Sequence, residues 1–434
     1  MMGDDRLNRR EWMRAAGCTA GTLSAAALAA SAFPGTSPLL AQDAAKPARR
    51  LPRVAAINSI YRLRSHAYHI AGRFIHGYTW QGKHHQPPFQ LVRMFDHQQP
   101  KDDLGPEVCQ KHGVELCKTV AEALGGDKLD VDAVLLIIEH GDYPVNKYGQ
   151  IEYPRYEMFE QIVEVFRKSG RSVPVFVDKH LSYDHQKAAR MVATARELKF
   201  PLMAGSSLPV TWRIPDIDPK LGTPFREGLV VFGYDRAQPE IYLFHALETL
   251  QVMLERRKGS ETGVKSVVGL EGEAVWQAAD KGLWSPELLE AALQRNPSRN
   301  YGKPREQVKR PQAILIEYAD GARGTVLNLA EACSELSFAG RIDGVSTPLA
   351  SLFFLPQPPG ARFFDPLTRN IEQFFATGKS PYPVERTLLT STMLDLALHS
   401  MHDGGKPVES PALAIRYEAP AEDGHARGRY TDVE

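Results

Sequence analysis

Three ionisable residues in succession, Asp178, Lys179 and His180, follow directly on the apolar run at 173–177. The pattern of segment 174–207 predicts a strand, a charged turn, an amphipathic helix and a second strand. In an open parallel sheet, ligands bind beyond the carboxyl ends of the strands. We therefore expect Lys179 to lie where a cofactor and a substrate meet, while a solvated turn is the ordinary alternative for such a tripeptide.

A second polar turn, at 139–143, follows the apolar run at 133–138. Because parallel strands end at the same edge of a sheet, this turn is expected to converge with the first one. We expect His140, Tyr143 and His180 to contact the hydroxyl groups of a sugar.

Trp212 and Arg213 come just after the last strand expected in the first half of the chain. An aromatic face and a guanidinium group suit a sugar, so we expect both to reach the same cleft; packing of Trp212 in the core is an equal alternative. The histidines and carboxylates of the two polar turns, with His245, would also suit a zinc-like ion. Because these residues are scattered, no metal site is predicted, and metal-assisted chemistry stays an alternative.

The elements that must position these residues alternate between strand-like and helix-like patterns. The strand-like runs lie at 54–57, 90–95, 133–138, 173–177 and 202–204. Such alternation predicts a parallel α/β sheet, here a Rossmann-type domain at 53–210. A linker at 42–52 precedes it.

The proline-rich segment 211–228 ends the alternation. Beyond it, runs of strands with flanking helices predict a second α/β domain at 211–420, with a large open, mostly antiparallel sheet covered on one face. Asp320-Gly321 is a hairpin signal within this sheet. We expect a flexible tail at 421–434.

The composition of the 434 residues is that of a folded globular protein, with 43% hydrophobic and 24% charged residues. Lysine plus arginine and aspartate plus glutamate both total 52, so there is no excess of basic charge to neutralise nucleic acid. Nucleic acid is therefore excluded as an expected partner.

The first 41 residues have the pattern of a twin-arginine export signal. Arg9-Arg10 precedes a weakly apolar stretch rich in alanine, glycine, serine and threonine. Cleavage is plausible after Ala32 or after Ala41, and retention as an anchor is the alternative. We expect an exported protein of the periplasm or cell envelope, with no stable membrane span after processing.

The chain resembles the Gfo/Idh/MocA family of glucose-fructose oxidoreductases and inositol dehydrogenases over residues 52–418. The resemblance is carried by Val177-Asp178-Lys179-His180, by Gly205-Ser206-Ser207-Leu208 and by the segment 381–411. It implies a Rossmann domain that binds NAD or NADP, a second domain that often mediates homo-oligomers, and a small-molecule sugar or polyol substrate.

The resemblance also implies roles for single residues. Lys179 would contact the substrate hydroxyl and the nicotinamide, and His245 would be the acid or base, since imidazole titrates close to neutral pH. The residues expected to contact the cofactor are Asn58, Ser59, Arg62, Asp96, Asp178 and Lys179. Asp96 would bind the adenosine ribose and favour NAD over NADP. His66, at a position that the family often fills with histidine, is expected to have a structural or supporting role.

Three positions depart from the family pattern. The loop after the first strand, Asn58-Ser59-Ile60-Tyr61-Arg62-Leu63, lacks the glycines that let a backbone approach pyrophosphate. His180 stands where the family has proline, and Ile241 stands four residues before His245, where an aspartate is common. Glu248 is in position to orient His245; an ordinary surface pair is the alternative.

The leading functional hypothesis is an exported NAD(P)-dependent oxidoreductase-like protein that acts on a sugar or polyol. A cofactor-free carbohydrate-binding or scaffold protein of the same fold is the first alternative. The second is a redox-neutral or metal-assisted enzyme that uses His140, His180 and His245.

Overall fold

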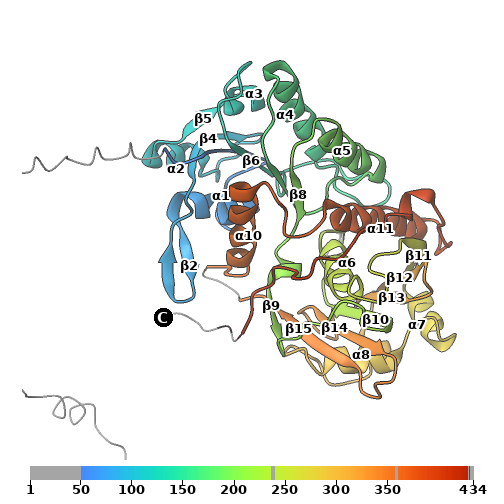
Figure 1. Cartoon of the computed structure of the whole chain (residues 1–434). Coiled ribbons are helices and arrows are strands. Elements are labelled where there is room, and N and C mark those ends of the chain that lie inside the picture. Colours follow the sequence, from blue (N-terminus) through green and yellow to red (C-terminus); the bar gives the residue numbers. More distant parts are fainter. Residues whose placement is uncertain (1–49, 236–239, 357–359, 429, 431–434) are drawn as a thin grey trace, which may run out of the picture. The chain divides into compact units, whose positions relative to one another are not determined.

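The computed structural model describes residues 50–235, 240–356, 360–428 and 430 (Figure 1). The predicted export signal and most of the linker lie outside these residues. The first half of the described chain forms a six-stranded sheet in the order β5-β4-β1-β6-β7-β8, and every neighbouring pair is parallel. Its strands are β1 (Arg53–Asn58), β4 (Gln90–Asp96), β5 (Glu115–Cys117), β6 (Ala133–Ile137), β7 (Val175–Asp178) and β8 (Leu202–Gly205). The predicted parallel α/β sheet is confirmed.

Helices cover both faces of this sheet because its strands are apolar on both sides. In β1, Ala55 and Ile57 pack in one core while Val54 and Ala56 pack in the other. The first core contains α3 (Val120–Leu124), α4 (Arg155–Ser169) and α5 (His185–Glu197), and the second contains α1 (His66–His76), α2 (Gly105–His112) and α10 (Phe364–Thr377). Figure 1 shows α10 beside α1, so a helix late in the sequence completes the second core.

The second sheet has seven strands in the order β11-β12-β13-β10-β14-β15-β9. These are β9 (Trp212–Ile214), β10 (Phe225–Phe232), β11 (Val264–Glu271), β12 (Gln312–Tyr318), β13 (Arg323–Asn328), β14 (Ser337–Ile342) and β15 (Leu349–Phe354). The β10–β13 pair is parallel and the other pairs are antiparallel. A mostly antiparallel sheet is thus confirmed, and Asp320-Gly321 does lie in the turn between β12 and β13.

The expectation that helices cover one face of this sheet was wrong. Val230 and Phe232 of β10 pack on the side of α6 (Glu240–Leu254) and α11 (Val384–His402), while Leu229 and Val231 pack on the side of α7 (Glu273–Asp280) and α8 (Pro286–Leu293). Both sets of β10 side chains are apolar, so each face needs a cover. The remaining short elements are the hairpin of β2 (Tyr78–Trp80) and β3 (Lys83–His85), and α9 (Pro304–Gln307).

Part of the tail that was predicted to be flexible is buried, within the residues that the structure describes. Asp423 is completely buried, and its Oδ2 lies 2.6 Å from a guanidinium nitrogen of Arg213. His425 is buried beside it and contacts Asp216 at 3.2 Å. Paired buried charges hold this segment against the second sheet. Within the described ranges, no helix combines the length and the apolar character that crossing a membrane requires.

Candidate active site

Polar residues follow the carboxyl ends of four neighbouring strands of the first sheet. Ser59 follows β1, Glu139 and His140 come after β6, Lys179 follows β7 and Ser206 follows β8. Because the sheet is parallel, these turns meet at one edge, as the sequence predicted. Helix α6 of the second half brings His245 to the same edge, where Lys179 and His140 line one cavity with it.

Lys179 is held in a constrained position at this edge. Its backbone φ is 64°, in the left-handed region that residues with a side chain seldom adopt. The amide of Lys179 donates to the carbonyl of Gly205 at 3.1 Å, which ties the ends of β7 and β8 together. Such strained residues are concentrated at functional sites.

The ammonium group of Lys179 is paired with Glu139. Nζ lies 2.8 Å from Oε1 of Glu139, while Arg155, the first residue of α4, binds the other carboxylate oxygen. Burial alone would raise the pKa of Glu139, but the charges of Lys179 and Arg155 outweigh it and hold that pKa well below its ordinary value. Two cations therefore share one carboxylate in a buried place.

Two histidines stand beside this pair. Nδ1 of His66 lies 2.7 Å from Oδ2 of Asp178, and His66 lines the cavity. His140 has a φ of 68°, and its buried Nε2 has no hydrogen-bond partner in the described chain. Burial lowers the pKa of both imidazoles, and Lys179 lowers each further, so they are neutral near pH 7. Asp178 does not line the cavity itself; it contacts His66, which does.

His245 is held by a chain of hydrogen bonds that starts at Glu248. The hydroxyl of Ser206 donates to Oε2 of Glu248, and Ser206 Oγ lies 2.9 Å from Nδ1 of His245. Gly205 makes room for this carboxylate, because a Cβ at Gly205 would lie 2.9 Å from Oε1 of Glu248. Both His245 and Glu248 are buried, so the surface pair weighed in the sequence analysis is not what the fold contains.

This chain of hydrogen bonds fixes the tautomer of His245. A hydroxyl has one proton, and that of Ser206 is given to Glu248, so Ser206 accepts a hydrogen bond from Nδ1–H of His245. The lone pair then lies on Nε2. Burial, and next the charge of Lys179, lower the pKa of His245 to about 4 against the opposing effect of Glu248. His245 is therefore a neutral base at pH 7.

The cavity between these groups, here called the central cavity, has a volume of about 430 Å³. That lies within the range of small-molecule sites. Its polar wall includes Lys179, Glu139, Glu335, Arg64 and four histidines, and Phe363 and Phe364 supply apolar faces. The histidines are His66, His69, His140 and His245.

Four residues predicted to contact the substrate lie elsewhere. His180 is completely buried between Arg155 and the ring of Phe244. Tyr143 stacks on His97 instead, with its hydroxyl 2.9 Å from Nδ1. In neither case does the side chain line the central cavity.

Trp212 and Arg213 are the other two. They belong to β9, which pairs with β15 at the edge of the second sheet and so leads away from the central cavity. Arg213 is completely buried against Asp423, and Trp212 lines a different cavity. The prediction that both reach the cleft with Lys179 was wrong, because strand pairing redirects the chain directly after β8.

The segment after β1, residues 58–65, does not fit the pyrophosphate of a dinucleotide. In the glycine-rich loops that bind one, free backbone amides face the phosphates. Here the amides of Ser59, Tyr61 and Arg62 already donate to protein oxygens at 3.0 to 3.2 Å. Helix α1 begins only at His66, and the side chain of Ser65 accepts from the amide of Tyr68.

Side chains occupy the space that glycines would leave open. Ile60 and Tyr61 are buried, and the hydroxyl of Tyr61 lies 3.0 Å from where a Cβ of Gly72 would be. Asp103 binds the amide of Tyr61, so a carboxylate stands where a phosphate would need a donor. Arg62 is partly exposed and pairs with Asp102 at 3.4 Å.

Asp96 does lie at the end of β4, beside Asn58. The amide nitrogen of Asn58 donates to Oδ1 of Asp96 at 2.9 Å, and burial raises the pKa of Asp96 to about 7. Four buried oxygens here have no partner in the described chain: Asn58 Oδ1, the Tyr61 hydroxyl, Asp96 Oδ2 and Asp103 Oδ2. The carbonyl and carboxylate oxygens among them require donors such as hydroxyl groups, which a phosphate does not bring.

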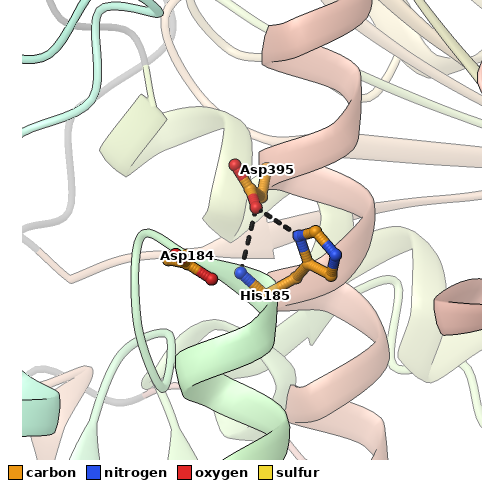
Figure 2. A group of neighbouring side chains, drawn as sticks. All are labelled: Asp184, His185 and Asp395. Carbon is orange, nitrogen blue, oxygen red and sulfur yellow. Dashed lines mark hydrogen bonds and ion pairs between the residues drawn. The ribbon is translucent and has the colours of Figure 1, made fainter.

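The described residues include two clusters with metal-ligand chemistry, and neither lies at the central cavity. Figure 2 shows one of them, in which Asp395 of α11 binds the backbone amide and the ring of His185. Asp184 is turned to its own helix and caps α5. Oδ1 of Asp395 also accepts from Gln150 and contacts His399 at 3.2 Å, so its oxygens are already satisfied and the cluster is a hydrogen-bonded link between α5 and α11.

Sequence reasoning did not single out Ser206 or Arg155. Ser206 follows β8 as Lys179 follows β7, so the strand-end rule that found Lys179 could have found it. Arg155 lies in sequence between β6 and β7, at the start of a helix, and no local signal connects it with Lys179. Glu139 was part of a predicted polar turn, but its pairing with Lys179 was not foreseen.

No family model matches the sequence, and no curated protein matches it. Solved structures do match. GenD2 from gentamicin A biosynthesis, in complex with NAD, has a TM-score of 0.52 at 16% identity, over 83% of this chain and 96% of that one. Myo-inositol 2-dehydrogenase from Lactobacillus plantarum has a TM-score of 0.51 at 13% identity, over 83% and 99%. Apo scyllo-inositol dehydrogenase from Lactobacillus casei has a TM-score of 0.50 at 11% identity, over 83% and 98%.

Proposed function

We propose that this protein, whose fold is that of the Gfo/Idh/MocA-type oxidoreductases, is an enzyme that performs acid–base chemistry on a sugar, or on an oxidised polyol with a carbonyl group, in the central cavity. The observation that carries the proposal is that a base and a cation line the same cavity. His245 is a neutral base fixed by Ser206, and Lys179 is a cation fixed by Glu139.

The chemistry follows from these two groups. Nε2 of His245 accepts a proton from the carbon next to a carbonyl group of the bound sugar. The electron pair of that C–H bond forms an enolate, and the ammonium group of Lys179 stabilises the oxygen that becomes negative. Transfer of the proton of the neighbouring hydroxyl group to the enolate oxygen, and delivery of the proton from Nε2 of His245 to the former carbonyl carbon, complete an isomerisation. Every proton and electron is accounted for without an oxidant.

The walls of the central cavity support a hydroxyl-rich ligand. Neutral imidazoles both accept and donate hydrogen bonds, and four histidines line this cavity. Phe363 and Phe364 provide apolar faces for the carbon side of a sugar ring.

Oxidation of the same ligand with NAD or NADP is the second candidate, and the fold favours it, since GenD2 was solved with NAD. The position of Asp96 at the end of β4 also suits a ribose. The segment 58–65 opposes this candidate. The amides of Ser59, Tyr61 and Arg62 already donate to protein oxygens, and side chains fill the space that a pyrophosphate would need. We therefore rank redox-neutral chemistry first.

Deuterium exchange tests the proposal without knowledge of the product. The full chain is purified without added nucleotide, and a panel of sugars and polyols is incubated with it in D₂O and followed by proton NMR. We expect a carbon-bound proton of one ligand to exchange without NAD(P), and the exchange to disappear in His245→Ala. His402→Ala, at an exposed position on α11, is the matched control and should behave like the wild type.

The other outcomes are distinct. Stoichiometric NAD or NADP released from the denatured protein, with turnover only in its presence, would replace the first candidate by the second. Ligand binding without exchange or turnover, unchanged in His245→Ala, would mean a carbohydrate-binding protein.

Export is a separate proposal, which the twin-arginine pattern supports. Fusion of residues 1–49 to a reporter should deliver it to the periplasm, and Arg9→Lys with Arg10→Lys should retain it in the cytoplasm. Delivery of both fusions alike would contradict the proposed route.

A further inference from the structure

A second cavity, separate from the central one, lies between the β2–β3 hairpin, helix α10 and the tail residues 424–427 and 430. Its volume is about 520 Å³. Among the described residues, no aspartate or glutamate lines it, although acidic and basic residues are equally frequent in the chain. The cations and aromatic rings on its wall are Arg362, Arg369, Arg427, Trp80, Trp212 and Tyr430. We call it the arginine cavity.

The carboxylates that pair with these arginines do not line the cavity. Arg369 is half-exposed, at 51% of its side chain, and it contacts Glu372 only at 3.4 Å. The two oxygens of Glu372 are also bound by Tyr78 and His85, each at 2.7 Å. Arg369 therefore keeps donors for an incoming anion.

Arg362 and Arg427 also leave some N–H donors of their guanidinium groups unused. Arg362 uses Nε for Asp365 at 3.2 Å and Nη2 for the carbonyl of Thr79 at 3.2 Å. Arg427 uses Nη2 for Asp218. Since a guanidinium group has five N–H donors, each still has donors for a carboxylate or sulfate.

Aromatic rings complete the wall. Trp212 is 8% exposed and meets the ring of Tyr430 edge to face at 5.0 Å, and Trp80 is half-buried on β2. Flat indole faces are suited to the apolar side of a sugar ring. Gln81, Asn370 and Gln373 add amide groups that can bind hydroxyls.

The walls are fixed before any ligand binds. The buried pair of Arg213 and Asp423 anchors the tail, and the bond from Tyr78 to Glu372 anchors the hairpin to α10. A site held by buried ion pairs loses little conformational entropy on binding.

The arginine cavity and the central cavity have no described lining residue in common, but each shares one with a third cavity. His69 lines both the central cavity and a smaller cavity of about 270 Å³, and Arg362 lines both that smaller cavity and the arginine cavity.

From these observations we propose that the arginine cavity binds an anionic saccharide, whose carboxylate or sulfate groups pair with the arginines while its rings stack on the tryptophans. The combination excludes a purely apolar ligand, because three cations line the cavity. Its binding does not depend on the reaction proposed for the central cavity.

Calorimetry with defined oligosaccharides tests this site. The full chain is titrated with tetragalacturonate, a heparin-derived tetrasaccharide and neutral maltotetraose, together with inorganic sulfate. We expect one of the charged tetrasaccharides to bind at least roughly tenfold more tightly than maltotetraose, because each charge-assisted pair contributes on the order of 1.4 kcal/mol or more. Which one binds distinguishes carboxylate from sulfate recognition.

Three variants locate the site. Arg369→Gln should weaken the charged tetrasaccharide roughly tenfold, and Trp80→Ala should weaken it while leaving the response to sulfate unchanged. Arg196→Gln removes the same charge from an exposed position on α5 and should bind like the wild type. His245→Ala should also bind normally, which separates this site from the central one.

Opposite results would overturn the proposal. Equal binding of maltotetraose would show that the arginines do not contribute, and an equal loss in Arg196→Gln would show diffuse electrostatics rather than a site. Tighter binding of an oligothymidylate of the same charge would assign the cavity to single-stranded nucleic acid instead.

Discussion

Nζ of Lys179 lies 2.8 Å from Oε1 of Glu139, and both side chains are almost completely buried. The second oxygen of Glu139 is bound by Arg155, so the group of three carries one positive charge in excess. A fixed positive charge next to a neutral base is the arrangement that stabilises a developing oxyanion. The charge of Glu139 also determines how much stability is lost when Lys179 is replaced.

Replacing Lys179 by methionine should destabilise the fold by about 3 kcal/mol, because it removes one of the two cations that compensate a buried carboxylate. Glu139→Gln in the same chain should recover part of this loss. Urea unfolding measures both, and Lys168→Met, at an exposed lysine of α4, is the control. If the double variant is no more stable than Lys179→Met, the charge of Glu139 is not what makes the single change costly.

The pH dependence of turnover should reflect His245. Its pKa is lowered to about 4, so the base form is present above that pH and is lost below it. We expect kcat to rise with pH through about pH 4 and then to level, rather than to rise near the ordinary pKa of histidine, about 6.5. A limb near pH 6.5 would mean that His245 is not the base or is not buried during turnover.

Ser206 and Glu248 are positioning residues that act through His245. Ser206→Ala should lower kcat more than it raises KM, and Ser206→Thr, which keeps the hydroxyl group, should restore most of the activity. Glu248 raises the pKa of His245, so Glu248→Gln should move the acid limb to still lower pH. If the acid limb of the pH profile does not move, and activity falls only as much as the amount of folded protein, then the two residues have a structural role alone.

The link between α5 and α11 should make stability depend on pH. Hydrogen bonds from His185 and His399 outweigh burial and hold the pKa of Asp395 below its ordinary value, so its contribution is lost as the pH falls. The hydrogen bond to Asp395 raises the pKa of His185, whose contribution is lost as the pH rises. Asp395→Asn should therefore cost the most between roughly pH 4 and 6.5, by about 2 kcal/mol. Thermal unfolding across this range measures it.

The same residues offer a test of the metal interpretation. Because the oxygens of Asp395 are already satisfied, zinc added to the wild type should leave its melting temperature unchanged. A zinc-dependent increase that disappears in Asp395→Asn would contradict this assignment.

The tail should contribute to stability although it ends the chain. Removal of residues 421–434 leaves the guanidinium group of Arg213 buried without its partner, and we expect a loss of about 3 kcal/mol. Asp423→Asn should reproduce most of this loss. Glu422→Gln, at the exposed neighbouring position, is the control and should unfold like the wild type. Equal stability of the truncated chain would restore the original expectation of a free tail.

Local patterns predicted the first sheet and its strand-end residues well. The position of Lys179 followed from one apolar run and the rule that ligands bind at strand ends. The resemblance to Gfo/Idh/MocA proteins pointed to His245 as its partner; solved structures with names of that kind share the fold of this chain, and the role of His245 stays a prediction. The glycine-free segment after β1 already indicated that dinucleotide binding would be difficult.

Residues whose position depends on long-range pairing were placed wrongly. Trp212 and Arg213 were assigned by their closeness in sequence to β8, but β9 pairs with β15 and carries them to another cavity. The tail was expected to be free because nothing in its sequence shows that Asp423 meets Arg213. His180 was expected in the cleft because it follows Lys179, yet it is directed towards Arg155.

The apolar runs and the positions where they end are properties of the local sequence. The sequence alone therefore determined that Lys179 would stand at the edge of a parallel sheet. Whether that lysine meets a carboxylate, a base or a cofactor depends on side chains from β6, α4 and α6, which are distant in sequence. Their distances and burial arise only when the two sheets and their helices are packed together. The tertiary structure therefore decided that Glu139 pairs with Lys179, that Ser206 orients His245, and that the segment after β1 is closed.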